Sequence, residues 1–425
     1  MQTPKISNPF KPGAGHSPPY LAGRDAEKAE FRKLLAQTTI LSNLILTGLR
    51  GVGKTVLLEE LKPIAMKEKW LWVGTDLSEA STVNETTIVQ RLLADLSVVT
   101  SAITVSEPAS PKGFSLSPEV KNNNLNFAGL FSLYDGQPGL AADKLKAVLE
   151  VVWKCLSNFG VRGIVFAYDE AQTMSDHSRE KQFPLSLLLD VFQSIQRKDI
   201  PFMLVLVGLP TLATKLVEAR TYSERMFDIQ ILGKLSTKDS TEAIRKPIES
   251  AKCPVKFSPQ TVDLIVGVSG GYPYFIQFIC KELFDVFIQQ VEVEGRATPV
   301  PIDGILKKLD KDFFAARWGR ATDRQRQMLS IIARLSSCDD EFTVQEITTE
   351  SRKTGHPFSA SHTNQMLTAL TNAGLVYKNR HGRYSFAVPL LGKFILRQEL
   401  EDKQLKQMSL PLDAPPCNTK ARHPE

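Results

Sequence analysis

The sequence has few cysteines and no long apolar run, and both shortages exclude whole classes of protein. The five cysteines lie far apart in the chain: Cys155, Cys253, Cys280, Cys338 and Cys417. Without a Cys-x-x-Cys pair or a nearby histidine, neither a disulfide framework nor a zinc site is expected. No stretch approaches the ~18 apolar residues of a membrane-spanning helix, and the first thirty residues lack the apolar segment of a signal peptide. We therefore expect a cytoplasmic protein with reduced thiols and no membrane partner.

Charge of one sign is also in short supply. The formal net charge is +6, from 52 Lys and Arg against 46 Asp and Glu over 425 residues. Such a mild excess permits a polyanionic partner but does not require one. A hydrophobic content of 42% is ordinary for a globular chain, and the length predicts about two to three domains.

A glycine-rich loop follows the short apolar stretch NLILT and precedes an amphipathic segment. From Gly48 to Thr55 it fits G-x-x-x-x-G-K-[ST] in the strand–loop–helix context that this pattern needs. Glycines let the backbone fold around phosphates with its amides pointing at the anion. Lys54 would add a cation there, and the Thr55 hydroxyl would ligate Mg²⁺. The predicted ATP-binding residues of the loop are Gly48, Leu49, Arg50, Gly51, Val52, Gly53, Lys54, Thr55 and Val56.

A pair of acidic residues ends the apolar stretch GIVFAY, as in a Walker B strand. Asp169 and Glu170 at the end of a buried strand are costly unless they bind something. With Thr55, Asp169 would hold Mg²⁺, and Glu170 would orient a water molecule as general base. The alternative is that the pair only caps a following helix. Together with the glycine-rich loop, the pair predicts ATP hydrolysis.

Strands that alternate with helices as far as Leu232 predict an α/β fold with a doubly wound parallel sheet of the P-loop NTPase kind. Beyond it, three helical segments follow with serine starts and a Gly-Gly stop, a region that the family resemblance described below implies is a lid. The order helix–helix–helix–hairpin after it predicts a winged helix-turn-helix. The predicted divisions are an extended arm (1–19), an ATPase core (20–232), a helical lid (233–318), a winged helix (319–402) and a disordered tail (403–425). Within the core, residues from about 100 to 138 show no sustained period. We interpret them as a long, partly mobile insertion, or else as an ordered loop of irregular structure.

With these motifs, and over roughly residues 8–396, the sequence resembles AAA+ ATPases of the origin-recognition-initiator and related STAND-like branch. PPYLAGRDAE resembles the N-terminal box of that family, which implies that Pro19, Tyr20 and Leu21 lie near the adenine. An ordinary entry segment is the alternative. The strand LVLVG is followed by Leu209 and Pro210, so the polar sensor 1 residue of the family is missing.

Two further segments carry the resemblance. TYSERMFDIQ resembles the arginine-finger segment, which implies that Arg225, or else Arg220, acts on the ATP of a neighbouring subunit. A surface arginine paired with Glu224 or Asp228 is the alternative. SGGYPYF resembles the sensor 2 region without its arginine, in the Gly-x-Pro form that implies packing of Pro273 toward the nucleotide. The resemblance also implies self-association or an unidentified protein partner.

Basic residues gather at the hairpin of the predicted winged helix. Residues 320–400 hold eleven Lys and Arg against seven Asp and Glu. Lys378, Arg380 and Arg383 surround one turn, and Asn364 lies on the helix before it, so these residues are candidates for contact with double-stranded DNA. The same polar residues would also suit a solvated face or docking onto protein, and both interpretations stay open.

The sequence therefore predicts a Mg²⁺-dependent ATPase that couples its nucleotide state, ATP or ADP, to DNA association or to recruitment of a partner. The main alternative is a STAND-like signalling or defence switch whose winged helix is a protein-packing module. A chaperone-like subunit that drives another protein is the third. The basic hairpin favours the first hypothesis, and the Gly-Tyr-Pro motif favours the second.

Overall fold

The structure is a computed structural model. It describes residues 7–13, 15–108, 120–251, 256–294, 300–355, 357–380 and 382–408. Contacts between residues divide the chain into two units. The first runs to Leu309 and also includes Tyr377–Asn379 and Ala387–Pro389, and the second comprises the rest of the chain from Asp310 onward. No helix of the described residues is long and apolar enough to cross a membrane.

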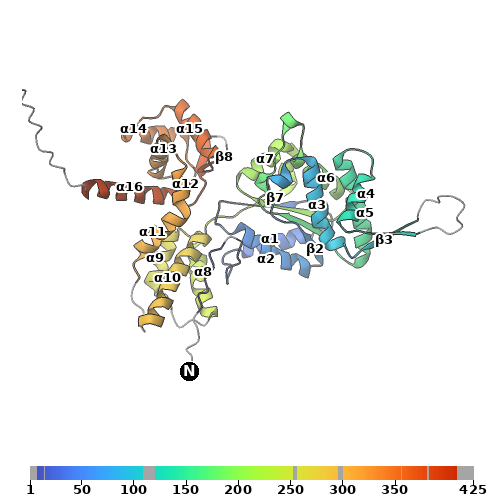
Figure 1. Ribbon diagram of the computed structural model, residues 1–425, viewed down its shortest axis with the longest axis horizontal. Helices are drawn as coiled ribbons and strands as arrows, with labels where there is room; N and C mark the ends of the chain where they lie inside the picture. The colour runs from blue at the N-terminus through green and yellow to red at the C-terminus, as the bar shows by residue number, and fades with distance from the viewer. Residues whose placement is uncertain are drawn as a thin grey trace, which may run out of the picture. The chain divides into compact units, whose positions relative to one another are not determined.

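The first unit is built on a five-stranded parallel sheet with the order β2-β5-β6-β1-β7 (Figure 1). Its strands are β1 (Asn43–Thr47), β2 (Trp70–Val73), β5 (Gly163–Tyr168), β6 (Phe202–Gly208) and β7 (Phe227–Ile231). Every residue of β1, β5 and β6 is buried, as their unbroken apolar sequences predict for strands covered on both faces. The predicted α/β fold is confirmed.

Helices cover both faces of this sheet. On one face, Phe31 and Leu57 pack with Val205, and on the other Leu149 and Phe192 pack with Phe166. Burying one such side chain contributes about 1.5–3 kcal/mol. The first face carries α1 (Asp25–Leu35) and α2 (Lys54–Lys67), and the second carries α3 (Glu85–Thr100), α5 (Ala141–Leu156), α6 (Pro184–Gln196) and α7 (Thr211–Ala219). Single 3₁₀ turns between them are η1 (Ala80–Thr82), η2 (Ser157–Phe159), η3 (Ala171–Thr173), η4 (Ser178–Glu180) and η5 (Thr221–Arg225).

The parallel register brings three chain segments to one edge of the sheet. Thr47 pairs with Gly208, and Tyr168 pairs with Leu206, so β1, β5 and β6 end close together. The loops that follow these strands carry the glycine-rich sequence, the acidic pair and Leu209. Ligands of open α/β sheets bind at this carboxyl edge.

The segment interpreted as an irregular insertion is more regular than expected. It contains an antiparallel hairpin of β3 (Thr104–Pro108) and β4 (Val120–Asn124), followed by α4 (Phe127–Asp135). Leu125 and Leu130 are fully buried in the core, and the Asn126 side chain accepts the Gly129 amide at 2.9 Å to begin α4. The expectation of irregular structure is wrong for these residues. Two leucines anchor the segment in the core, and two apolar residues are too few to produce a periodic pattern in the sequence. Residues 109–119 lie outside the described ones.

The described residues of the region predicted as a lid form four helices, one more than the three expected: α8 (Thr237–Ser250), α9 (Pro259–Ser269), α10 (Pro273–Glu294) and α11 (Ile302–Leu309). Ser236 and Ser258 cap the first two, each accepting a backbone amide at 3.1 Å. Gly270 takes the left-handed conformation that ends α9. The serine starts and the glycine stop expected from the sequence are confirmed.

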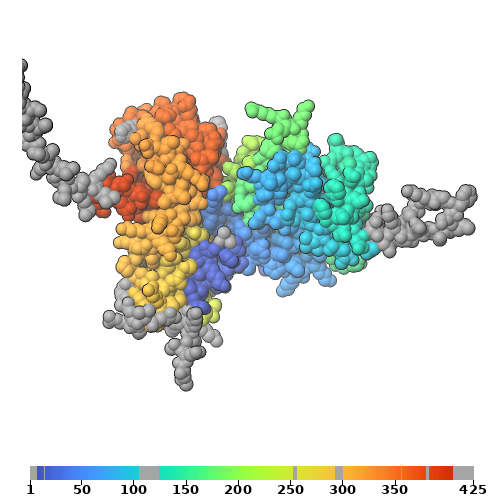
Figure 2. Space-filling view, in the orientation of Figure 1, coloured from blue at the N-terminus to red at the C-terminus, as the bar shows by residue number. Residues whose placement is uncertain are grey.

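The N-terminal arm is fixed to this lid (dark blue against yellow in Figure 2). Phe10 is 2% exposed, and its ring lies 6.1 Å from that of Phe284. The Asn8 amide donates to the Lys281 carbonyl at 2.8 Å and to the Asp285 carboxylate at 2.7 Å. The arm is extended, as expected, but it is also a packed part of the first unit.

Among the described residues of the second unit, the helices α13 (Asp323–Ala333), α14 (Val344–Lys353) and α15 (Ala360–Asn372) are followed by a hairpin. Phe342, just before α14, forms a single antiparallel bridge with Tyr384 of the hairpin. A closing helix, held by an ion pair between Arg397 and Asp310 at 2.9 Å, reaches Met408. Residues 403–408 are therefore helical, against the expected tail, and 409–425 lie outside the described residues. The elements are η6 (Asp310–Phe314), α12 (Ala315–Gly319), α13 (Asp323–Ala333), α14 (Val344–Lys353), α15 (Ala360–Asn372), β8 (Val376–Arg380), β9 (Arg383–Phe386) and α16 (Leu391–Met408).

Candidate nucleotide site

All three glycines of the phosphate loop are required by the structure. A Cβ at Gly48 would lie 2.4 Å from the Leu232 carbonyl oxygen. Gly51 and Gly53 have φ angles of 79° and 89°, in the left-handed region that costs other residues roughly 1–2 kcal/mol. Lys54 begins α2 and folds back over the loop, where its Nζ donates to the carbonyls of Gly48 and Leu49 at 2.9 Å each. The loop is thus closed around the lysine side chain.

Other carbonyls of the loop bond to elements outside it. The Gly51 carbonyl accepts the Tyr274 amide at 3.2 Å, and the Val52 carbonyl accepts the Arg24 guanidinium at 3.0 Å. In contrast, the amides of residues 49–53 donate no hydrogen bond to any residue that the structure describes. Consecutive unpaired amides next to a lysine form a site for an anion such as a phosphate.

Arg24 is a functional candidate that the sequence reasoning missed. It is 5% exposed, and it bonds to the Gly233 carbonyl at 2.9 Å as well as to the loop. Burial lowers the pKa of this guanidinium, and Glu27, at 3.3 Å, opposes that effect. Arg24 therefore joins the phosphate loop to the start of the lid. Its only signal in the sequence was its place in the Gly-Arg-Asp motif.

Asp169 and Thr55 meet below the loop. Asp169 is 3% exposed and accepts the Thr55 hydroxyl at 2.5 Å and the Glu170 amide at 2.7 Å. Burial raises the pKa of the Asp169 carboxyl against these two hydrogen bonds, and the charges of Glu170 and Asp76 raise it further. A buried carboxylate beside a hydroxyl is a donor set that Mg²⁺ accepts, so the residues present fit the predicted metal.

For Lys54, the same buried environment shifts the pKa in the direction opposite to that of Asp169. Burial lowers the pKa of its ammonium, while Asp169 and Glu170 act to raise it. A cation and an anion are thus both held where their charged forms are disfavoured, as is common at functional sites.

Glu170 is exposed at the end of β5 and has an unusual backbone. Its φ of 52° lies in the left-handed region, and its carbonyl accepts the Thr173 amide at 3.0 Å. Its carboxylate accepts a short hydrogen bond from the Gln172 side chain. Strained residues cluster at active sites, where the surrounding structure holds them.

Arg225 is not brought to the phosphate loop of its own chain. In the register of β7 on β1, Phe227 pairs with Asn43 and Ile231 with Thr47. Arg225 precedes β7 and therefore lies near the amino edge, about 17 Å of strand away from the loop. It is exposed and forms no ion pair with Glu224, Asp228 or any other described residue.

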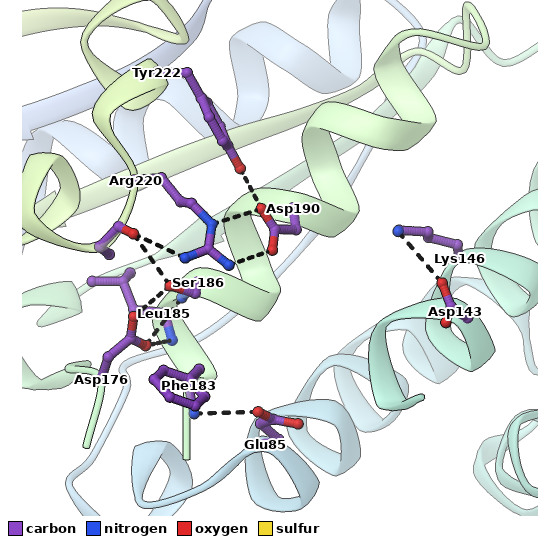
Figure 3. Close-up of polar contacts among 11 residues, drawn as sticks. Glu85, Asp143, Lys146, Asp176, Phe183, Leu185, Ser186, Asp190, Arg220 and Tyr222 are labelled. Carbon is purple, nitrogen blue, oxygen red and sulfur yellow. Dashed lines mark hydrogen bonds and ion pairs between the residues drawn. The ribbon is translucent and has the colours of Figure 1, made fainter. Parts of the chain in front are cut away.

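Arg220, the second candidate finger, is occupied within the chain (Figure 3). Its guanidinium donates twice to the Asp190 carboxylate, at 2.9 and 2.7 Å, and the Tyr222 hydroxyl donates to the same group at 2.6 Å. Burial alone would raise the pKa of Asp190, but these bonds lower it. Arg220 therefore holds α6 and the end of α7 together.

The residues expected near the adenine lie between core and lid. The Tyr20 hydroxyl donates to Glu242 at 2.9 Å, and the Lys246 ammonium lies 4.2 Å from the centre of the tyrosine ring. Leu21 packs against the core, and Pro19 is exposed. Pro273 is half-buried and begins α10 directly before Tyr274, whose amide contacts the loop. Of these residues, Pro273 is the one that the structure brings next to the phosphate loop.

The candidate DNA residues lie on α15 and on the hairpin of β8 and β9. Lys378 and Arg383 are exposed on the paired strands β8 and β9. Asn364 is exposed on α15, and its amide donates to the Ala360 carbonyl of the same helix at 3.0 Å. The Arg380 side chain lies outside the described part of the chain.

Comparison with known proteins identifies relatives by fold. A family described as "Domain of unknown function (DUF8462)" matches residues 311–395. None of the curated proteins matches the chain. Among solved structures, the Walker-type ATPase PABY2304 of Pyrococcus abyssi is 14% identical, with a TM-score of 0.52 over 88% of this chain and 96% of that one. The ADP form of the Aeropyrum pernix ORC2 protein is 16% identical, with a TM-score of 0.52 over 94% and 100%. These likenesses confirm the predicted resemblance at the level of the fold.

Proposed function

We propose that this chain, which has the fold of AAA+ ATPases of the initiator branch, binds ATP with Mg²⁺ and hydrolyses it. The observation that supports this best is the state of the phosphate loop, whose carbonyls are bonded while its amides are open. An anion and a divalent cation together would satisfy the amides, Lys54, Thr55 and Asp169. Solved ORC2 structures with ADP and with ADPNP and ADP support a nucleotide as the ligand.

The phosphates bind to the amides of residues 48–56, and Lys54 turns from the loop carbonyls to the β- and γ-phosphate oxygens. Thr55 and Asp169 hold Mg²⁺, which neutralises phosphate charge when it is bound. Glu170 orients a water molecule and takes its proton, because its charge lies close enough to Asp169, at the same edge, to raise the pKa of that carboxyl.

The adenine lies between the core and the lid, next to Pro19, Tyr20 and Leu21. Tyr20 already bonds to α8 of the lid, and Pro273 stands beside the phosphate loop. A nucleotide in this position would touch both parts of the first unit. Its presence would therefore favour one arrangement of the lid.

Arg225 acts as the finger on a neighbouring subunit. Its exposure, its lack of an ion pair among the described residues and its distance from its own loop support action in trans. Arg220 is less suited, since the bidentate pair with Asp190 would have to break. The proposal includes self-association of the chain.

Nucleotide state is coupled to DNA association or partner recruitment through α15 and the hairpin of β8 and β9, by Asn364, Lys378, Arg380 and Arg383. A STAND-like switch is the alternative, and one observation favours it. The Tyr274 amide bonds directly to the Gly51 carbonyl, so the lid contacts the phosphate loop itself. In that case nucleotide retention matters more than turnover.

The test is ATP binding and phosphate release by the purified chain, with Mg²⁺ or with EDTA. Lys54→Ala should weaken ATP affinity about a hundredfold, because it removes charged hydrogen bonds worth up to ~3 kcal/mol. Lys62→Ala, an exposed lysine on the same helix, should match the wild type. Equal ATP affinity of Lys54→Ala and the wild type would contradict the proposal.

Double-stranded DNA at two salt concentrations separates the two outputs. Stimulation of hydrolysis that falls with salt supports DNA association. Nucleotide retained with almost no turnover, whether DNA is present or absent, supports the switch.

A further inference from the structure

We propose that Gln172 is a positioning residue that ties Glu170 to the end of β6, and that Gly208 is glycine to leave room for the Gln172 amide. This inference rests on the proposed ATP hydrolysis, because it concerns the group proposed as general base.

The Gln172 side chain bridges two segments of the sheet edge. Its Oε1 accepts the Leu209 amide at 3.0 Å, and its Nε2 donates to a carboxylate oxygen of Glu170. A backbone N–H can only donate, so the oxygen of the glutamine must face Leu209 and its NH₂ group must face Glu170. The two bonds therefore fix the orientation of the amide.

Gly208 makes this bridge possible. A Cβ at position 208 would lie 2.6 Å from Gln172 Oε1 and 3.1 Å from Leu212 Cδ2. Gly208 is not among the glycines with left-handed backbone, so what it supplies is space. The glutamine amide thus occupies the space that the side chain of any other residue at position 208 would fill.

The main chain of Gln172 is held from the other side. Lys215 of α7 donates to the Gln172 carbonyl at 2.5 Å and to the Ser175 hydroxyl at 2.8 Å. Burial lowers the pKa of this lysine. The side chain of Gln172 is thus attached to the β6–α7 connection, and its main chain is attached to α7 itself.

The bridge compensates for the polar side chain that is missing at the end of β6. Gly208, Leu209 and Pro210 offer no side-chain donor to Glu170. Gln172 supplies the donor from the acidic segment itself and uses a backbone amide of β6–α7 as its anchor. With the carboxylate held, less conformational freedom has to be lost before the water molecule attacks the γ-phosphate, and misplacement by about 1 Å can cost about a hundredfold in rate.

Three variants test the bridge. Gln172→Glu keeps an acceptor for Leu209 but loses the donor to Glu170, Gln172→Leu loses both, and Gly208→Ala displaces the amide from outside. Each should lower kcat about tenfold or more, with KM and ATP affinity within about twofold of the wild type, because phosphate binding does not use these groups. A merely structural role would not split kcat from KM in this way.

Gln182→Leu is the matched control. Gln182 also accepts a backbone amide, that of Glu85 at 3.1 Å, but makes no contact with Glu170. It should leave kcat unchanged. The double variant Gly208→Ala/Gln172→Leu should be no slower than Gln172→Leu, since both changes remove one interaction.

Wild-type turnover by Gln172→Glu, or losses that add in the double variant, would overturn the inference. An active wild type, an inactive Glu170→Gln variant and Gln172 variants that match the Gln182→Leu control would overturn the bridge and leave ATP hydrolysis standing. No hydrolysis by the wild type would overturn both.

Discussion

The carboxyl edge of the sheet and the hairpin of β8 and β9 both carry charged residues, but they hold them in opposite ways. At the sheet edge, Asp169 is almost fully buried and Lys54 is drawn into the loop, with burial raising the pKa of the first and lowering that of the second. At the hairpin, Lys378 and Arg383 are exposed to solvent.

The difference shows where structure alone argues for function. Burying a charged group costs free energy unless it is paired or bound to something, so its persistence points to a ligand. An exposed cation costs nothing and therefore carries no such information. The nucleotide site is supported by the free energy that burying its charged groups costs. The DNA surface is supported only by the residue types that it contains.

Arg225 is the residue most able to break this comparison, because it is exposed and yet proposed to be catalytic. Arg225→Ala should lower the ATPase rate of the assembled protein about a thousandfold, as expected for a lost arginine finger. The measurement is turnover against protein concentration, with Arg179→Ala, another exposed arginine of the core, as control. Equal loss in a monomer and in the assembly would rule out action in trans.

Glu170→Gln tests the sheet edge, which is the other side of the comparison. Without a carboxylate to take the proton from water, kcat should fall about 10²–10³-fold while ATP still binds. Glu180→Gln, an exposed carboxylate of η4, should turn over normally. A Glu170→Gln variant of undiminished kcat would remove Glu170 from its role.

Charge reversal at the hairpin tests whether its exposed cations contact DNA. Lys378→Glu combined with Arg383→Glu should weaken DNA binding about tenfold and flatten its salt dependence, since each lost phosphate contact lowers the slope by roughly 0.9. Arg320→Glu with Arg352→Glu makes the same charge change at exposed positions outside the hairpin. If this control pair weakens binding equally, the hairpin is not the contact surface.

The smallest expected effect concerns stability. Because the pKa of Asp169 is raised in the folded protein, the ionised carboxylate destabilises the nucleotide-free protein above the ordinary pKa of an aspartate. Asp169→Asn should therefore be more stable at pH 7, by on the order of 1 kcal/mol, and this advantage should vanish at pH values below that ordinary pKa. Thermal unfolding at the two pH values measures it, and a less stable Asp169→Asn at pH 7 would contradict the account.

The fold and the phosphate site could be predicted because their signals are local in the sequence. The glycine pattern from Gly48 to Thr55, and an acidic pair directly after a buried strand, lie within single strand–loop units. Parallel strand order then brings such units to one edge, whatever the side chains between them.

Contacts between distant segments were not predictable in this way. Gln172 meets Leu209 only through the register of β5 on β6, and Arg24 reaches Val52 only once α1 has packed beside α2. The burial of Leu125 was not predicted, because a single apolar residue among polar neighbours forms no periodic pattern.

Single-turnover conversion of ATP to ADP, with the purified protein in excess over nucleotide, tests the central claim most directly. The account predicts complete conversion in the presence of Mg²⁺, faster at higher protein concentration, and none with EDTA. ATP recovered intact from the wild type with Mg²⁺, at every protein concentration, would contradict the assignment of the sheet edge as a site of hydrolysis.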